Sequence, residues 1–165
     1  MGKQSSFAQA VKYAIAGIRF GFQLERNMRR DFWLAHVILG VEIVIRPPLS
    51  AVVATIMAVS LVMSAELFNT AIERAVDQIT NGKWSYQAKI AKDTAAGAVL
   101  LTAMGSIGIG IWAVICARPW HVYVFSFQNF DGLILALGYL CTLWYFHGAT
   151  FKEIDVLTDK EENQK

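Results

Sequence analysis

Four polar side chains recur along one apolar stretch of the chain at spacings of three and four residues. They are Glu66, Asn69, Glu73 and Asp77. At about 100° of rotation per residue, these positions share one face of a helix. Between Glu66 and Glu73 a helix rises about 10 Å, so the four residues run from an apolar segment to its polar end. Carboxylates placed in this way can accept protons, hold a cation or line an ion route.

Charged residues at two other places in the chain could join this group. Glu25 stands before one apolar run, and Lys92 with Asp93 stands before another. Two carboxylates from different helices at a membrane surface suit Mg²⁺, which takes oxygen ligands and usually keeps some water and substrate phosphate oxygens. A site for a metal and a nucleotide is therefore plausible. It is not a P-loop, because the nearest Gly-Lys pair is followed by Trp84.

The composition decides what kind of protein carries these groups. Hydrophobic residues make up 55% of the 165 residues and charged residues 17%, and the mean hydropathy is +0.41. This is more apolar than a soluble domain of this size can bury, so we predict an all-α membrane protein. The net charge of +2 argues against nucleic-acid binding. Cys116 and Cys141 lack the spacing of a disulfide framework or a zinc site.

The apolar runs predict the elements that position the polar groups. An amphipathic helix on the membrane surface comes first, with apolar residues at helical spacing beside a basic stripe. Three core transmembrane helices follow, and then a fourth, C-terminal span. The predicted spans are 32–45, 49–72, 94–117 and 133–146. The corresponding regions are the surface helix at 1–31, the three-span catalytic core at 32–117, the extra span at 118–151 and a polar, frayed tail at 152–165.

Basic residues predict the orientation of the chain. Arg and Lys are concentrated before the first span and between the second and third spans, and short cytoplasmic segments carry this excess. Both termini and the middle loop are therefore expected on the cytoplasmic side. Glu25, Glu73 and Lys92 fall on that side as well.

Three short blocks resemble the prokaryotic diacylglycerol kinase family. Residues 66–77 match its ExxNxxxExxxD signature. Ala91-Lys92-Asp93, followed by residues 96–100, matches its second block. Residues 25–29 read Glu-Arg-Asn-Met-Arg, which is similar to the block of family members that phosphorylate undecaprenol. The resemblance extends over about residues 6–117. Asp31 stands where undecaprenol-type members often have a histidine.

The resemblance implies a homotrimeric lipid kinase in the bacterial cytoplasmic (inner) membrane, with its active site on the cytoplasmic side. It would use ATP and Mg²⁺ to phosphorylate the hydroxyl of a lipid alcohol, converting diacylglycerol to phosphatidic acid or undecaprenol to undecaprenyl phosphate. The roles it implies are Glu66 and Asn69 as catalytic residues, Glu25 and Glu73 as metal ligands, Tyr13, Lys92 and Asp93 as nucleotide contacts, and Arg29 and Glu66 as lipid contacts.

Two other functions compete with the kinase. Carboxylates along a span can also line an ion or proton channel. However, the stretch 49–65 carries no acidic residue that would continue the row across the membrane. The charged groups gather instead at one surface, as a nucleotide site requires, which favours the kinase. An inactive scaffold of the same fold is the third possibility, and the intact set from Glu66 to Asp93 argues against it.

Overall fold

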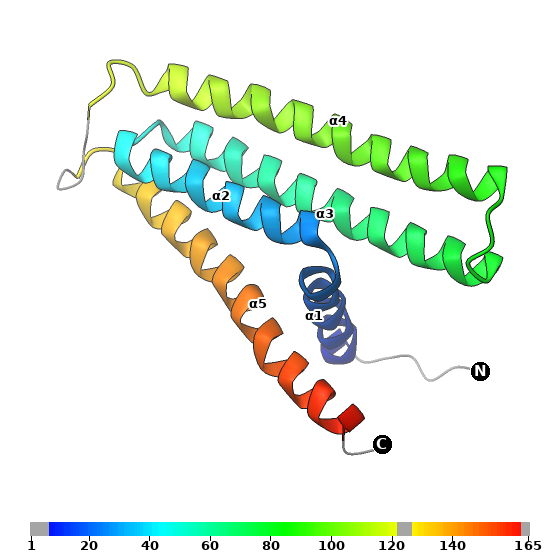
Figure 1. Ribbon diagram of the computed structural model, residues 1–165. Helices are drawn as coiled ribbons and strands as arrows, with labels where there is room; N and C mark the ends of the chain where they lie inside the picture. The colour runs from blue at the N-terminus through cyan, green and yellow to red at the C-terminus, as the bar shows by residue number, and fades with distance from the viewer. Residues whose placement is uncertain (1–6, 122–126, 163–165) are drawn as a thin grey trace.

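The computed structural model describes residues 7–121 and 127–162, which form five helices and no strands. The expected all-α architecture is therefore confirmed. Figure 1 shows α2 and α3 side by side as a hairpin, α4 alongside α3, and α5 diverging from the turn of that hairpin toward α1. The helix bounds are α1 Phe7–Leu24, α2 Arg26–Ile45, α3 Leu49–Thr80, α4 Tyr86–Cys116 and α5 Phe130–Glu162.

The chain turns sharply between α1 and α2 at Glu25, which we call the α1–α2 corner. Glu25 has an extended backbone (φ −103°, ψ 120°) and precedes the first residue of α2. Arg29 closes the corner, because its Nη1 donates hydrogen bonds of 2.9 Å to the carbonyl oxygens of Phe22 and Gln23. Cationic groups at a helix C-terminus satisfy free carbonyls in this way. The region boundary that we set at residue 31 lies inside α2, one and a half turns after this break.

A proline corner joins α2 to α3 and is tied to the start of α5. Arg46 adopts a left-handed conformation (φ 49°), and Pro47 and Pro48 cannot continue the preceding helix. The buried Arg46 side chain donates to the carbonyl oxygens of Ile43 (2.7 Å) and Gln128 (3.3 Å). In return, Asn129 donates to the Arg46 carbonyl over 2.6 Å. One end of the bundle is thereby fixed by hydrogen bonds.

A tight turn at the opposite end joins α3 to α4. Asn81 and Gly82 both have positive φ, 51° and 70°, and this left-handed conformation favours Asn and Gly. Ser85 then caps α4, since its hydroxyl accepts a hydrogen bond of 3.1 Å from the Ala88 amide. The two helices run antiparallel along their length (Figure 1). Lys92 and Asp93, two of the predicted nucleotide-side residues, follow this turn on α4.

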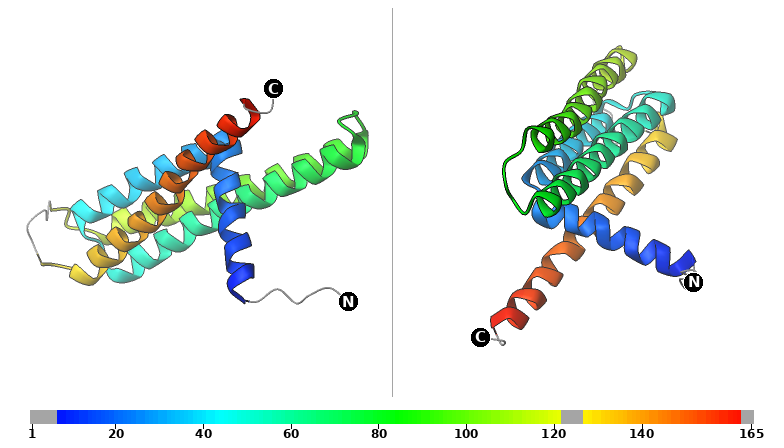
Figure 2. Two further views of the ribbon diagram at one scale, coloured as in Figure 1. Left: turned by 90° about the horizontal axis from the view of Figure 1, so that it is seen from below. Right: turned by 90° about the vertical axis from the view of Figure 1, so that its right-hand side faces the viewer.

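The main core joins four of the helices. Its buried members come from α1, α2, α3 and α5, and Figure 2 shows α1 and α5 meeting near the start of α2. Gly21 brings α1 close to α3, where a Cβ atom would collide with Leu67. The core therefore lies directly beneath the turn of α3 that bears Glu66. Its buried members are Phe22, Met28, Phe32, Ala35, Val59, Met63 and Leu143.

Three helices among the described residues are long and apolar enough to cross a membrane. They are α3, α4 and the first part of α5, Phe130–His147, so the chain is a multi-pass membrane protein. The run 32–45 in α2 is shorter than the roughly 20 residues of a span and is interrupted by Glu42. Glu42 is buried and accepts a hydrogen bond of 2.5 Å from Thr55 of α3. A crossing by α2 stays a prediction.

The polar C-terminal region differs from our expectation. We predicted a frayed tail at 152–165, but α5 continues as a helix through Glu162. The last residues, 163–165, lie outside the description. Extending an existing helix adds one hydrogen bond per residue without a new nucleation step. A polar sequence rich in Lys and Glu can therefore continue a long apolar helix.

Candidate active site

The predicted row of polar residues lies on α3 and runs from the interior of the bundle to its surface. Glu66 is only 3% exposed and Asn69 9%. Glu73 is half-buried and Asp77 is exposed. The burial thus falls steadily along the helix, as expected for groups that leave the apolar zone. A buried carboxylate at Glu66 is energetically costly in such surroundings, and this cost points to a functional role.

Hydrogen bonds hold this row in place. The Nδ2 of Asn69 donates to Oε1 of Glu73 over 2.9 Å. The hydroxyl of Thr70 donates to the Glu66 carbonyl over 2.9 Å. Oδ1 of Asn69 is buried and has no hydrogen-bond partner within the described part of the chain. A buried acceptor in this state calls for a donor from outside the described residues.

Charged groups from three segments surround Glu66. Asp31, Arg30, Glu25 and Glu73 all act on it electrostatically. Two of them, Glu25 and Glu73, are site residues predicted from sequence, and both lie within electrostatic range of Glu66. The structure also adds Asp31 and Arg30 of α2, which the sequence analysis did not place in the site. Four carboxylates and one guanidinium leave a net negative charge at this place.

Helical periodicity could have located Asp31. It follows Met28 by three positions and precedes Ala35 by four, and both of these residues are buried in the core. Positions with these spacings share a helix face, so Asp31 had to point inward. Burial raises the pKa of the Asp31 carboxyl above its ordinary value, and the neighbouring Arg30 guanidinium offsets part of this effect. Asp31 also makes a loose ion pair with Arg30 at 3.9 Å.

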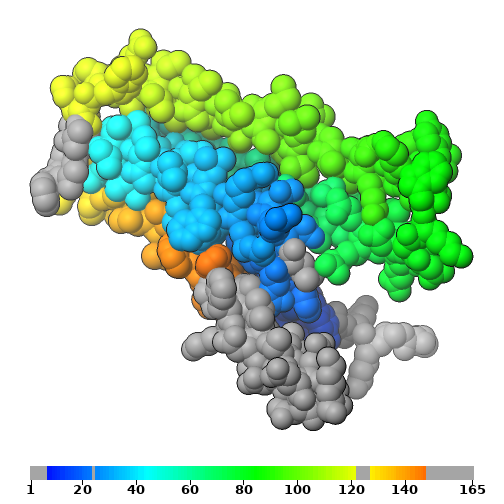
Figure 3. All heavy atoms as spheres, in the orientation of Figure 1, coloured from blue at the N-terminus to red at the C-terminus, as the bar shows by residue number. Residues whose placement is uncertain are grey.

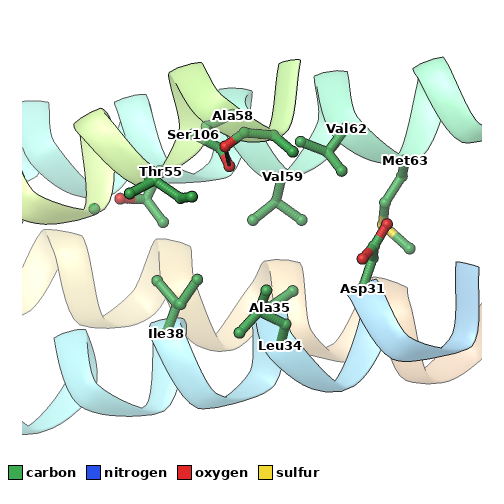
Figure 4. Close-up of a pocket in the computed structure, with 13 residues that line it drawn as sticks. Asp31, Leu34, Ala35, Ile38, Thr55, Ala58, Val59, Val62, Met63 and Ser106 are labelled. Atoms are coloured by element: carbon green, nitrogen blue, oxygen red, sulfur yellow. Dashed lines mark hydrogen bonds between the residues drawn. The ribbon is translucent and has the colours of Figure 1, made fainter. Parts of the chain in front are cut away.

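An apolar groove extends from Asp31 between α2, α3 and α4. Figure 4 shows Asp31 beside Met63 at one end, with Thr55 and Ser106 toward the other. In Figure 3 this region is the recess between α4 and α2. The groove holds about 600 Å³ of empty space, including space open to the surroundings. Its walls are otherwise apolar, with Leu34, Ile38, Val59, Val62 and Ile107 among them.

The predicted nucleotide-side residues Lys92 and Asp93 lie at the far end of the α3–α4 hairpin. The Lys92 ammonium pairs with the Asp77 carboxylate at 2.6 Å, and Asp93 pairs with Lys89 one turn away. Together they line a cleft beside the α3–α4 turn, near Trp84. Lys92 thus contacts the last residue of the row on α3. Eleven residues of α3, about 16 Å of helix rise, separate Asp77 from Glu66.

Two other predicted residues make their observed contacts outside the Glu66 cluster. Tyr13 is 68% exposed on α1 and makes no hydrogen bond to the charged cluster among those found in the described residues. Arg29 uses its guanidinium to close the α1–α2 corner. The observed hydrogen bonds of the Arg29 side chain are therefore to the backbone of α1. Nucleotide binding by Tyr13 and lipid binding by Arg29 stay predictions.

The residues present suit Mg²⁺. Among the described residues no group of three or more His, Cys, Asp or Glu side chains is close enough to hold a metal on its own. Mg²⁺, however, is usually bound by one or two carboxylates together with water and substrate phosphates. Glu25 and Glu73 supply two carboxylates within a net negative cluster. Such a cluster favours a cation.

Comparison with known proteins places these features in a family. A sequence model described as prokaryotic diacylglycerol kinase matches residues 12–114. A diacylglycerol kinase of Synechocystis sp. (strain ATCC 27184 / PCC 6803 / Kazusa) is 38% identical over 106 residues, which cover 61% of this chain and 58% of that protein. A diacylglycerol kinase of Haemophilus influenzae is 28% identical over 103 residues, covering 62% of this chain and 85% of that protein.

The matched segment has clear limits. It spans little more than half of the length of the Synechocystis protein. It contains the polar row of α3, the α1–α2 corner and the Lys92 region, whereas α5 lies beyond it. No solved structure matches the chain significantly.

Proposed function

The chain belongs to the prokaryotic diacylglycerol kinase family, and we propose that it is a lipid kinase that transfers the γ-phosphate of ATP to the hydroxyl of a membrane lipid alcohol. Diacylglycerol is the first candidate acceptor and phosphatidic acid its product. The observation that carries the proposal is the buried Glu66 carboxylate, which lies among acidic groups on a row of polar residues that leads to Lys92. This arrangement supports a phosphotransferase that acts at the membrane surface.

Glu66 would act as the general base. Attack on phosphorus requires that the acceptor hydroxyl lose its proton, and a positioned carboxylate can accept it. Glu66 is buried in α3 and held in an ordered helix, so its carboxylate has few orientations. Asn69 fixes Glu73 on the same face. The proton would pass from the lipid oxygen to the Glu66 carboxylate as the new P–O bond forms and the bond to ADP breaks.

Glu25 and Glu73 would hold the Mg²⁺ ion. When bound, this ion neutralises charge on the transferring phosphoryl group and on the leaving diphosphate. The two carboxylates come from the α1–α2 corner and from α3. Their relative position therefore depends on how these helices pack. Asn69 contributes by restraining one oxygen of Glu73.

Lys92, Asp93 and Tyr13 would contact the nucleotide. Lys92 carries the positive charge that phosphates require, and Asp77 now neutralises it over 2.6 Å. A phosphate near Lys92 would compete with that carboxylate for the ammonium group. Exposed ion pairs are weak, at most about 1 kcal/mol, so this exchange is energetically accessible.

The lipid would reach Glu66 from the membrane side, with Arg29 and Glu66 at its polar end. The apolar groove that begins at Asp31 fits a hydrocarbon chain. Undecaprenol is the alternative acceptor, and the Glu-Arg-Asn-Met-Arg sequence at 25–29 favours it. Apolar walls do not discriminate between an acyl chain and a prenyl chain. The enzyme would act at the cytoplasmic face of a bacterial inner membrane, as a homotrimer.

Purified protein in mixed micelles tests the proposal directly. Labelled ATP and Mg²⁺ are supplied with diacylglycerol in one series and undecaprenol in another, and lipid-linked phosphate is measured. We expect label on one of the two lipids, and none with the Glu66→Gln variant. Absence of label on both lipids, from protein shown to be folded, would overturn the proposal.

A further inference from the structure

The C-terminal helix contributes to the site region although it lies beyond the part of the chain that matches the family. The family match ends at residue 114, and α5 begins at Phe130. Nevertheless α5 packs against α1, α2 and α3. Its Leu143 is buried in the same core as Phe22, Phe32 and Met63. Part of the support for the α1–α2 corner therefore comes from α5.

His147 of α5 contacts this corner through its imidazole ring. It stacks on Phe32 with ring centroids 4.4 Å apart and planes inclined by 10°. It also meets Phe22 edge-on at 6.1 Å and 90°. Phe22 is the last large core residue of α1, and Phe32 lies in the second turn of α2. His147 thus contacts both sides of the corner at once.

The acidic residues of the corner lie close in sequence to the buried residues that pack with His147 and Leu143. Glu25 lies between Phe22 and Met28, both of them buried. Asp31 directly precedes Phe32, which is fully buried. A displacement of Phe32 would therefore move Asp31, because both lie on the same stiff turn of α2, and a displacement of Phe22 would move the end of α1 from which Glu25 follows. On α3, Met63 from the same core lies one turn before Glu66.

The other end of α5 is fixed independently of this contact. Just before α5, Gln128 accepts a hydrogen bond from the Arg46 side chain and Asn129 donates one to the Arg46 carbonyl. Within α5, Tyr139 shares a hydrogen bond of 2.8 Å with Ser60 of α3. Loss of the His147 ring would therefore leave α5 attached to the bundle. It would remove support specifically at the α1–α2 corner.

We propose that His147 is a positioning residue that holds the α1–α2 corner, and with it Glu25 and Asp31, in place relative to Glu66. This inference rests on the proposed kinase function for its effect on activity. His147 itself touches neither substrate nor metal in this proposal. It acts through the rings of Phe22 and Phe32.

Three variants separate the ring contact from general packing. His147→Ala removes the ring, and His147→Phe retains a flat ring that can stack on Phe32. Tyr145→Ala is the matched control, because Tyr145 is an exposed aromatic residue two positions away on α5. We expect His147→Ala to raise the Mg²⁺ concentration for half-maximal activity by about tenfold, as for partners that orient metal ligands. For His147→Phe and Tyr145→Ala, the Mg²⁺ concentration for half-maximal activity should stay within about twofold of the parent value.

A distance measurement provides a readout that does not depend on activity. Spin labels are placed on cysteines at Asn27 of α2 and Ile79 of α3, both exposed, in a background with Cys116→Ser and Cys141→Ser. We expect the distance distribution to broaden in His147→Ala and to match the parent in His147→Phe. If His147→Ala does not fold, His147→Leu replaces it with the same expectation, because it fills volume without a flat ring.

The outcomes are distinguishable. An unchanged distance distribution in His147→Ala, together with a superimposable magnesium titration, would overturn the positioning role. An equal defect in His147→Phe would also overturn it, because the stacked ring would then not be the relevant feature. If the parent protein phosphorylates no lipid, the kinase proposal fails, and the spin-label measurement alone still decides whether His147 holds the corner.

Discussion

Asn69 and Glu73 are joined side chain to side chain one turn apart on α3, with Nδ2 donating to Oε1 over 2.9 Å. The bond restrains one carboxylate oxygen of Glu73 and keeps it on the face that bears Glu66. The Asn69 amide oxygen, in contrast, is buried without a partner among the described residues. The two polar atoms of the Asn69 amide therefore differ. Nδ2 orients Glu73, whereas Oδ1 is available to accept a hydrogen bond from a bound group.

Replacement of Glu66 by Gln tests the base directly. The amide keeps the shape of the side chain but cannot accept the proton, so lipid phosphorylation should fall by at least about 100-fold, within the range of general-base contributions. Thermal unfolding in detergent should stay close to that of the parent protein. Near-parental turnover would show that Glu66 is not the base, and loss of folding would indicate a structural role.

Glu25→Gln and Glu73→Gln should each raise the Mg²⁺ concentration needed for half-maximal activity, because each change weakens one oxygen ligand. Asp131→Asn serves as the control, since Asp131 is exposed in the first turn of α5, at the proline-corner end of the bundle. The double variant should show less than the sum of the two single effects if both carboxylates bind one ion. Additive effects, or titrations like that of the control, would argue against shared coordination.

Separate changes to the Lys92–Asp77 pair distinguish nucleotide binding from stability. Lys92→Gln should raise the KM for ATP, because it removes a charge that the phosphates require. Asp77→Asn should not raise it, and the melting temperature should barely change, since an exposed pair contributes at most about 1 kcal/mol. Equal increases of KM in both variants would show that the intact ion pair, rather than free Lys92, is what matters.

Asp31 predicts a specific dependence of stability on pH. Burial raises its pKa in the folded state above the ordinary value near 3.8. The folded protein therefore binds this proton more tightly than the unfolded chain, and the contribution of Asp31 to stability falls as pH rises from that value through the folded pKa. Asp31→Asn should remove this decline and raise the melting temperature at neutral pH. A lower melting temperature at neutral pH would contradict the assignment.

The topology can be tested without reference to the kinase. Four spans with basic residues before the first and between the second and third predict that both termini are cytoplasmic. A single cysteine at Lys165 should react with a membrane-impermeant reagent only after the cells are opened. Labelling from outside intact cells would show an odd number of crossings. In that case α2 would be the helix to re-examine, because its apolar run is short.

Local patterns determined most of the fold. The proline pair after Arg46, the apolar runs and the Asn-Gly turn each correspond to an element of the structure. The exact break at Glu25 was not evident, because no proline or glycine marks it. It depends on Arg29, whose bonds to the α1 carbonyls are a tertiary contact that spacing does not encode. The extension of α5 through Glu162 likewise depends on continuation from an apolar helix.

The site was predictable where its residues share one helix. The row from Glu66 to Asp77 follows from the 3.6-residue period alone. For Glu25, the sequence predicted only that it lies on the same side of the membrane as the end of the row. The structure places it within electrostatic range of Glu66. Asp31 was missed as a member, although Met28 and Ala35 place it on the inward face. The contribution of α5 could not be predicted, because it depends on packing between residues more than 100 positions apart.

The length of α3 has a consequence for the two proposed substrates. Its 32 residues extend about 48 Å, whereas the hydrocarbon layer is about 30 Å thick. One helix is therefore long enough to pass from hydrocarbon to water, and its polar row lies toward the end that follows the apolar segment. Withdrawing a lipid chain into water costs roughly 0.8 kcal/mol per methylene group. For the proposed lipid kinase, a helix of this length would let each substrate stay in its own phase, so no lipid would have to be extracted into water.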